Sequence, residues 1–260
     1  MKTAENDIVN DIIRFNNSQN RVTAADFRST DSIQKRLREE VAQIPDVEYQ
    51  GGRRGGHADA IRRLPKLMPS YTVGQALAAL HGDPVVAYNQ KTEIWVTDKL
   101  YSKYFNDETT GPHLVLAYSL LRAVEAKKLG LVEKSRRNES SLTQEEQKQL
   151  QFFRQRGSTY LLAAAIAGCL ETFLDRRISN RFRISFGRVI GPKTAQQEWA
   201  KVVDRTAPFC ICLEEALKTG LKSVEKVNTA IQTFQSLVVS TKEANAPAYK
   251  AFASRIARPR

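Results

Sequence analysis

An unbroken run of eleven apolar or small residues, residues 160–170, constrains this chain more than any other part of its sequence. Because the run contains no charged side chain, none of its faces favours contact with water, and it is expected to be buried. It is too short to cross a bilayer, since a membrane-spanning helix needs about 20 apolar residues. The run therefore predicts a buried helix over residues 158–174 at the centre of a helical core.

Apolar residues recur at helical spacing through most of the remaining chain, which predicts a mainly α fold with a few short strands. Residues 32–44 contain one such stripe after Asp31, a residue type that often caps helices. Residues 143–146 have the Thr-x-x-Glu pattern of a capping box and predict the start of another helix. The other predicted helices cover residues 6–15, 73–81, 98–105, 112–129, 193–206, 209–219, 221–240 and 245–256.

Three shorter segments do not fit a helical pattern. Residues 47–50 predict a short extended segment. Pro65 and Pro69 favour irregular structure, because proline has a fixed backbone angle and donates no backbone hydrogen bond. Residues 94–96, Ile-Trp-Val, predict either a short strand or a buried loop.

A polar stretch divides the chain into two predicted modules. Gly130 is expected to end the helix before it, and residues 131–142 are dense in charged side chains and include the pair Ser140-Ser141. Such a composition is typical of an exposed linker. We therefore predict two packed helical modules, residues 1–130 and 143–260.

The charge is unevenly distributed. The 260 residues include 40 Lys and Arg against 28 Asp and Glu, a formal charge of +12, and residues 151–260 contain 18 basic against 8 acidic side chains. This excess predicts a polyanionic partner, DNA or RNA first, although a basic surface also serves solubility alone.

Cysteine content and the absence of long apolar segments bear on location. Cys169, Cys210 and Cys212 form an odd set in apolar surroundings, which argues against a disulfide framework or a structural zinc site. The first residues lack the apolar segment of a secretory signal, and no run is long enough for a membrane span. A cytoplasmic location without membrane contact is the expectation.

Two clusters of basic residues are candidate nucleic-acid-binding sites. Arg53 and Arg54 stand among four glycines, which let a backbone approach phosphates closely, and Arg62, Arg63 and Lys66 follow. The alternative is a solvated loop, and the P-loop pattern of nucleotide hydrolases is absent.

Residues 176–188 form the second cluster, with five arginines in thirteen residues. Of these, Arg181, Arg183 and Arg188 are the strongest candidates for contact with phosphates, and Phe182 and Phe186 between them suggest stacking on a single strand. The alternative is a half-buried strand with an ordinary solvated face.

A polar cluster lies near the start of the chain. It consists of Asn16, Asn17, Gln19 and Asp26. Carboxamides pair with base edges, which suggests contact with bases. The same side chains also cap helices in asparagine-rich turns, and both interpretations stay open.

No catalytic residue, metal site or cofactor is predicted. Asp83 lies near His81, but no partner nucleophile has an interpretable spacing, and Asp83 with Glu93 lacks the lysine of a nuclease pattern. Cys210 and Cys212 have apolar neighbours and no cation to activate a thiol. The competing interpretation is a metal-dependent nuclease whose carboxylates converge only in the folded protein.

Several motifs follow one another between residues 8 and 108. Residues 12–22 end a helix in an Asn-x-Gln turn, residues 26–29 are Asp-Phe-Arg-Ser, residues 31–34 are Asp-Ser-Ile-Gln, and residues 49–55 combine Tyr-Gln with Arg-Arg-Gly. In this order they resemble the abortive infection phage resistance (AIPR) family. Two upstream family segments, Asn-Asn-Gly and Ile-Val-Asn-Gly-x-Gln-Thr, are absent. The chain thus looks like the C-terminal portion of a longer protein, or like a truncated reading frame.

The resemblance implies a role in phage defence, often beside restriction-modification genes. Combined with the charge, it predicts a non-catalytic module that binds nucleic acid or other defence-system proteins. Two alternatives are a nuclease subunit of a restriction-type system and a module that binds proteins only.

Overall fold

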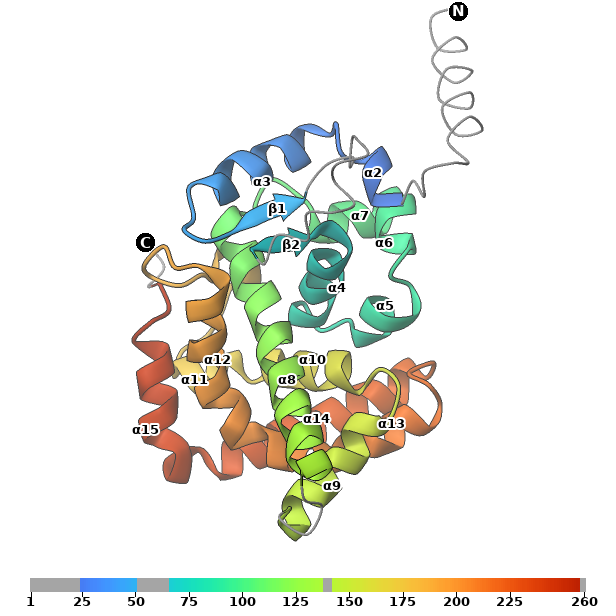
Figure 1. The fold of residues 1–260 in the computed structure, drawn as a ribbon, viewed down its shortest axis with the longest axis vertical. Helices are drawn as coiled ribbons and strands as arrows, with labels where there is room; N and C mark the ends of the chain where they lie inside the picture. Colours follow the sequence, from blue (N-terminus) through green and yellow to red (C-terminus); the bar gives the residue numbers. More distant parts are fainter. Residues whose placement is uncertain (1–23, 51–65, 138–141, 258–260) are drawn as a thin grey trace, which may run out of the picture.

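Helices make up most of residues 24–50, 66–137 and 142–257, the parts of the chain that this computed structural model describes (Figure 1). The prediction of a mainly α fold is confirmed. The first half contains α2 (Ala24–Phe27), α3 (Ser32–Ala42), α4 (Ser70–Leu80), α5 (Pro84–Asn89), α6 (Glu93–Val96), α7 (Asp98–Tyr104) and α8 (Gly111–Arg137). The second half contains α9 (Gln144–Arg154), α10 (Ser158–Gly168), α11 (Leu170–Leu174), η2 (Arg181–Arg183), α12 (Pro192–Thr206), η3 (Ala207–Leu213), α13 (Glu214–Lys218), α14 (Val224–Ser240) and α15 (Lys242–Ala253).

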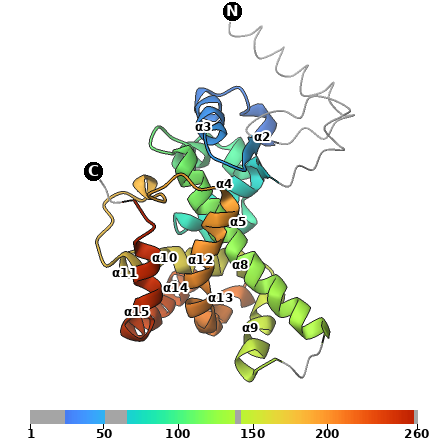
Figure 2. The same cartoon turned by 60° about the vertical axis from the view of Figure 1, so that its left-hand side comes forward.

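Helix α8 crosses the whole molecule and packs on α4, α10 and α12 (Figure 1, Figure 2). The indole Nε1 of the buried Trp199 on α12 donates to the carbonyl oxygen of Leu116 on α8 at 3.0 Å. The prediction that Gly130 ends this helix is wrong, since α8 continues to Arg137. Leu131 is buried one residue later, and burying a leucine is worth more than the roughly 1 kcal/mol that a helical glycine costs.

The apolar run lies at the centre of the core, as predicted. Residues 161–167 are all buried. The single helix predicted over residues 158–174 is instead two, α10 and α11, separated at Cys169. At this break the side-chain amide of Gln235 donates to the carbonyl oxygen of Gly168 at 2.8 Å.

Two short strands lie against α3 and α4. Strand β1 (Glu48–Gln50) pairs in parallel with β2 (Leu67–Pro69), and the partners Tyr49 and Met68 are buried. The extended segment at residues 47–50 is confirmed, whereas the irregular structure expected up to Pro69 is not. Pro69 pairs with Gln50 at the end of the strand, a position where a missing backbone donor disturbs the ladder little.

Residues 94–96 are neither strand nor loop but part of the short helix α6. Ile94 and Trp95 are buried, and the Trp95 ring centroid lies 4.9 Å from that of Phe105. The apolar character was therefore informative about burial but not about backbone conformation. The capping box predicted at residues 143–146 is present, because Thr143 and Glu146 exchange both hydrogen bonds.

The core continues from one predicted module into the other. Helix α12 packs on α8, and α10 packs on α4. The division into residues 1–130 and 143–260 stays a prediction. Within the described residues, no helix combines the length and the apolar character that crossing a membrane requires.

Candidate nucleic-acid interface

The predicted binding residues are distributed over three parts of the chain. Seven lie outside the described residues, namely Asn16, Asn17, Gln19, Arg53, Arg54, Arg62 and Arg63. Asp26 lies on α2, and Lys66 precedes β2 and forms an exposed ion pair with Asp46. Arg181, Arg183 and Arg188 lie in residues 176–188, here called the arginine segment, which connects α11 to α12.

The arginine segment is not the half-buried strand that its alternation suggested. It contains the 3-10 helix η2, followed by an isolated antiparallel bridge between Phe186 and Ile256. The side chain of Asn180 accepts a hydrogen bond from the backbone N–H of Phe182 at 2.9 Å. Such a local side-chain contact competes with strand pairing and favours the turn.

Arg181 points into the protein. Its guanidinium donates to the carbonyl oxygen of Leu80 at 3.0 Å, in the last turn of α4. Cations in this position satisfy carbonyl groups that have no partner within the helix. Arg181 also lines a cavity of about 270 Å³ together with Asn228, Gln232 and Gln235 of α14.

Two histidines hold the centre of the arginine segment. The Nδ1 atom of the fully buried His113 lies 2.9 Å from the carbonyl oxygen of Ile184, which only accepts, so this nitrogen carries the proton. The Nε2 atom of His113 then accepts from Nε2 of His81 at 3.1 Å. Phe182 covers the pair, with its ring centroid 4.1 Å from that of His81.

Burial determines the protonation state of the two histidines. It lowers the pKa of His81 to about 3 and that of His113 to about 4. Both imidazoles are therefore neutral at pH 7, which suits the hydrogen bond between them. The pair attaches the arginine segment to α4 and α8.

Asp83 is engaged elsewhere. Its Oδ2 atom accepts from the Tyr104 hydroxyl at 2.9 Å and lies 2.8 Å from the Lys103 ammonium. Burial raises the pKa of Tyr104, and the nearby Asp83 carboxylate raises it further. Asp83 thus stabilises the junction between α4 and α7 rather than activating His81.

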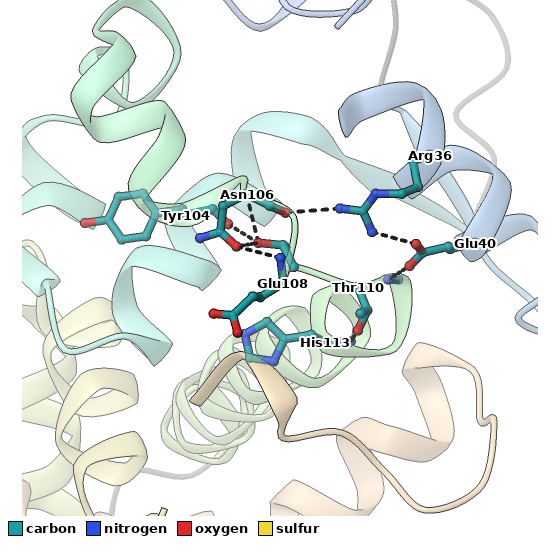
Figure 3. Close-up of polar contacts among 9 residues, drawn as sticks. Arg36, Glu40, Tyr104, Asn106, Glu108, Thr110 and His113 are labelled. Carbon is teal, nitrogen blue, oxygen red and sulfur yellow. Dashed lines mark hydrogen bonds and ion pairs between the residues drawn. The ribbon is translucent and has the colours of Figure 1, made fainter. Parts of the chain in front are cut away.

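The loop before α8, whose polar contacts are drawn in Figure 3, also contacts the arginine segment. The Arg36 guanidinium donates to the carbonyl oxygen of Asn106 at 3.0 Å and to Glu40 at 2.7 Å, and Glu40 accepts from the backbone N–H of Gly111 at 2.6 Å. Held in this way, the loop presents Glu108, which accepts from the Asn180 amide at 2.7 Å.

Three arginines of the segment face solvent, namely Arg177, Arg183 and Arg188, here called the outer arginines. The side chain of Arg183 is 73% exposed and lies 4.0 Å from Glu108. Arg177 and Arg188 have no ion pair within the described part of the chain. The phenylalanines between them do not face solvent in the same way, since Phe186 is buried and Phe182 packs on His81. Stacking of a single strand on these two rings is therefore not supported.

The acidic side chains and the thiols of the described residues give no indication of metal binding or of an activated nucleophile. Among the described residues, no group of three His, Cys, Asp or Glu side chains is arranged to hold a metal ion. Burial raises the pKa of Cys169 and Cys210 to about 12 and that of Cys212 to about 11, so these thiols are protonated at neutral pH.

Sequence reasoning missed His113 and Glu108 as partners of the arginine segment. The carbonyl of Ile184 is 71 residues from His113 in the chain, and no local pattern reports a pairing at that distance. The one available signal was a histidine inside the apolar face of a predicted helix, which indicates burial but not its partner.

Comparison with known proteins gives one match. The family model described as AIPR protein matches residues 1–170, a range that contains the residues 8–108 of the motif resemblance. No curated protein and no solved structure matches the chain.

Proposed function

Because the chain belongs to the AIPR family, we propose that it acts in phage defence as a non-catalytic module that binds nucleic acid. Membership of this family suggests phage defence, and the mode of action is inferred here from the outer arginines. The partner in this proposal is the phosphate backbone of DNA or RNA, bound without sequence preference. A module that binds only other defence-system proteins is the competing proposal.

The exposure of the outer arginines on an anchored segment carries the proposal. The segment between them is fixed by the hydrogen bond of Arg181 to Leu80, by the contact of His113 with Ile184, and by the Phe186–Ile256 bridge. Binding a phosphate therefore costs little further ordering of the backbone. Guanidinium groups match phosphate oxygens bidentately, and their charge survives at any physiological pH.

One further cation, Arg255, lies close to the end of the segment. The backbone N–H of Gly187 donates to the carbonyl oxygen of Arg255 at 2.7 Å, which brings Arg188 near the exposed Arg255. In the whole of residues 151–260 the basic side chains outnumber the acidic ones by 18 to 8. A surface of this charge favours backbone contacts, which give affinity but no sequence readout.

A charge-matched pair of variants tests the proposal. In the test variant Arg177, Arg183 and Arg188 are changed to Gln, and in the control Arg136, Arg154 and Arg156, also exposed, are changed to Gln. Both lose three charges. Binding of duplex and single-stranded DNA and RNA is measured by filter retention between 50 and 200 mM salt.

The wild-type affinity should fall at least about 10³-fold across this range if six or more phosphates are bound. The test variant should lose about three units of the log–log salt slope, whereas the control should lose less than one. Equal losses in both variants would show that net charge alone, rather than the arginine segment, is responsible. Salt-independent binding, or none at 50 mM salt, would favour the protein-binding alternative.

A further inference from the structure

A second potential binding site lies at the start of the arginine segment, between α11 and α15. These two helices pack side by side (Figure 1, Figure 2), and between them is a cavity of about 680 Å³, here called the α11–α15 cavity. Small-molecule sites typically enclose about 300–1,000 Å³. The cavity is therefore large enough for a ligand of nucleotide size.

The charges around the cavity favour an anion. Its lining contains three cations, Arg176, Lys242 and Lys250, against one acid, Asp175. Lys242 is paired with Asp175, and this ion pair lowers the pKa of the Asp175 carboxyl. Lys250 has no ion pair among the residues that the structure describes. Arg176 uses one nitrogen to donate to the carbonyl oxygen of Ala257 at 2.7 Å, which leaves its other N–H groups for a ligand.

The inner wall of the cavity is aromatic and includes the buried Tyr249. Tyr249 is only 2% exposed and its ring centroid lies 4.8 Å from that of Phe173, which also lines the cavity. The Tyr249 hydroxyl has no hydrogen-bond partner of ordinary geometry, and its neighbouring polar side chain is that of Asn245. Burial raises its pKa to about 12, so it is a neutral donor at pH 7. An ordered water or a ligand is one way in which such a buried polar group is satisfied.

We propose that the α11–α15 cavity binds a nucleoside monophosphate. The phosphate lies between Lys250 and Arg176, and the base lies against the apolar part of the lining, which includes Leu174, Ala253 and Ile256. The same chemistry is offered by a free nucleotide and by the 5′-phosphorylated end of a strand. The inference goes beyond the proposed function, because a free nucleotide can occupy the cavity without any strand on the outer arginines.

Calorimetric titration of the full chain with AMP, adenosine and inorganic phosphate tests the inference. AMP is expected to bind at least tenfold more tightly than adenosine and than phosphate, because only AMP engages both parts of the cavity. Lys250→Gln should weaken AMP binding at least fivefold, and Lys250→Arg should stay within about twofold of wild type. Lys222→Gln, which removes an equally exposed lysine outside the cavity, should leave AMP binding unchanged.

Equal affinities for AMP and adenosine would overturn the inference, as would equal losses in Lys250→Gln and Lys222→Gln. Competition against AMP then identifies the source of the nucleotide. Displacement by a 5′-phosphorylated oligonucleotide but not by its 5′-hydroxyl form assigns the cavity to strand ends, and no displacement by either assigns it to free nucleotides.

The two proposals fail independently. If AMP does not bind while oligonucleotides bind with a steep salt dependence, the cavity inference is wrong and the proposed function stands. If AMP binds and oligonucleotides do not, the proposed function is wrong and the cavity inference stands. The outer-arginine variant should bind AMP like wild type, since none of its three positions lines the cavity.

Discussion

The Nε2 atoms of His81 and His113 lie 3.1 Å apart, and the one proton they share in a hydrogen bond belongs to His81. This follows because the ring N–H of His113 is at Nδ1, where it donates a hydrogen bond to the carbonyl of Ile184. Its Nε2 atom is therefore an acceptor. A proton added at Nε2 of His113 would face the N–H group of His81. A proton added to either ring would also place a positive charge in a buried site. The contact between the arginine segment and the helices α4 and α8 therefore depends on two neutral rings.

Acid is expected to destabilise the protein through this pair. Both pKa values are lowered, to about 3 and about 4, so between these values and about 6.5 the unfolded state binds protons that the folded state does not. The contribution of the pair to the free energy of unfolding is fully present above about pH 6.5. It decreases as the pH falls, by at most about 1.4 kcal/mol per pH unit for each imidazole. Thermal melting between pH 7 and 5 measures the slope.

The variant His113→Gln serves as the control for this prediction. It should melt at a lower temperature at pH 7, because it loses a buried partner, but its melting temperature should vary less between pH 7 and 5. The acidic groups with lowered pKa values, Asp46, Glu146, Asp175 and Glu215, ordinarily titrate below this window. An unchanged slope in His113→Gln would show that other groups cause the acid sensitivity.

Two arginines only two positions apart should respond differently to substitution. Arg181→Met leaves the Leu80 carbonyl without its donor and should lower the free energy of unfolding by about 1–3 kcal/mol. Arg183→Met removes a mostly exposed side chain and should change it by less than about 0.5 kcal/mol. Urea denaturation compares the two variants, and similar costs would contradict the inward placement of Arg181.

Gly130 offers a test of the continuous helix. Nothing lies within 4 Å of the place where a Cβ atom would be added, and the residue is inside α8. Gly130→Ala should therefore stabilise the protein by about 0.5–1 kcal/mol, since alanine loses less backbone entropy in a helix. A loss of stability on thermal melting would indicate that the helix ends at this glycine after all.

Arg53 and Arg54 lie outside the described residues and give a cellular prediction. If they bind phosphates, changing both to Ala should impair protection against phage and leave the melting temperature almost unchanged, because surface substitutions cost within about 0.5 kcal/mol. Plaque counts and thermal melts are measured on the same variant. A melting temperature lower by many degrees would identify the two residues as structural.

A binding module should not cut nucleic acid. Incubation of plasmid DNA and of RNA with the purified chain and Mg²⁺ or Mn²⁺ is expected to leave both intact. Within the described residues, Asp83 is held by Tyr104 and Lys103 rather than by a second carboxylate. Cleavage that disappears in Asp83→Ala or Glu93→Ala would replace the binding module with the nuclease alternative.

Local patterns predicted the helices well where burial and periodicity agree. The stripe in residues 32–44 became α3, and the capping box at Thr143 opens α9. They failed at Gly130 and at residues 94–96, where tertiary contacts decided the conformation. Burial of Leu131 carried α8 past a glycine, and packing of Trp95 against Phe105 favoured a helical turn over a strand.

The candidate site was less predictable than the fold. The sequence treated Arg181 and Arg183 alike, as phosphate contacts or, in the alternative, as the solvated face of a strand. The turn at η2 instead sends Arg181 inward and Arg183 to solvent. The difference is made by the Leu80 carbonyl and by the two histidines. Leu80 and His81 are about 100 residues away in the chain, and His113 is about 70 residues away. Contacts at such separations leave no trace in local spacing.

The contact of Trp199 with Leu116 has an evolutionary consequence. Leu116 lies inside the stretch that matches the family model, residues 1–170, and Trp199 lies outside it. The indole fills a fully buried space against α8. A substitution at one of the two positions is therefore expected to require a substitution near the other. A relative that shares this fold but carries a smaller residue at the position of Trp199 is expected to carry a compensating larger one on α8, and grafting only the matching stretch onto an unrelated C-terminal half should leave that space empty.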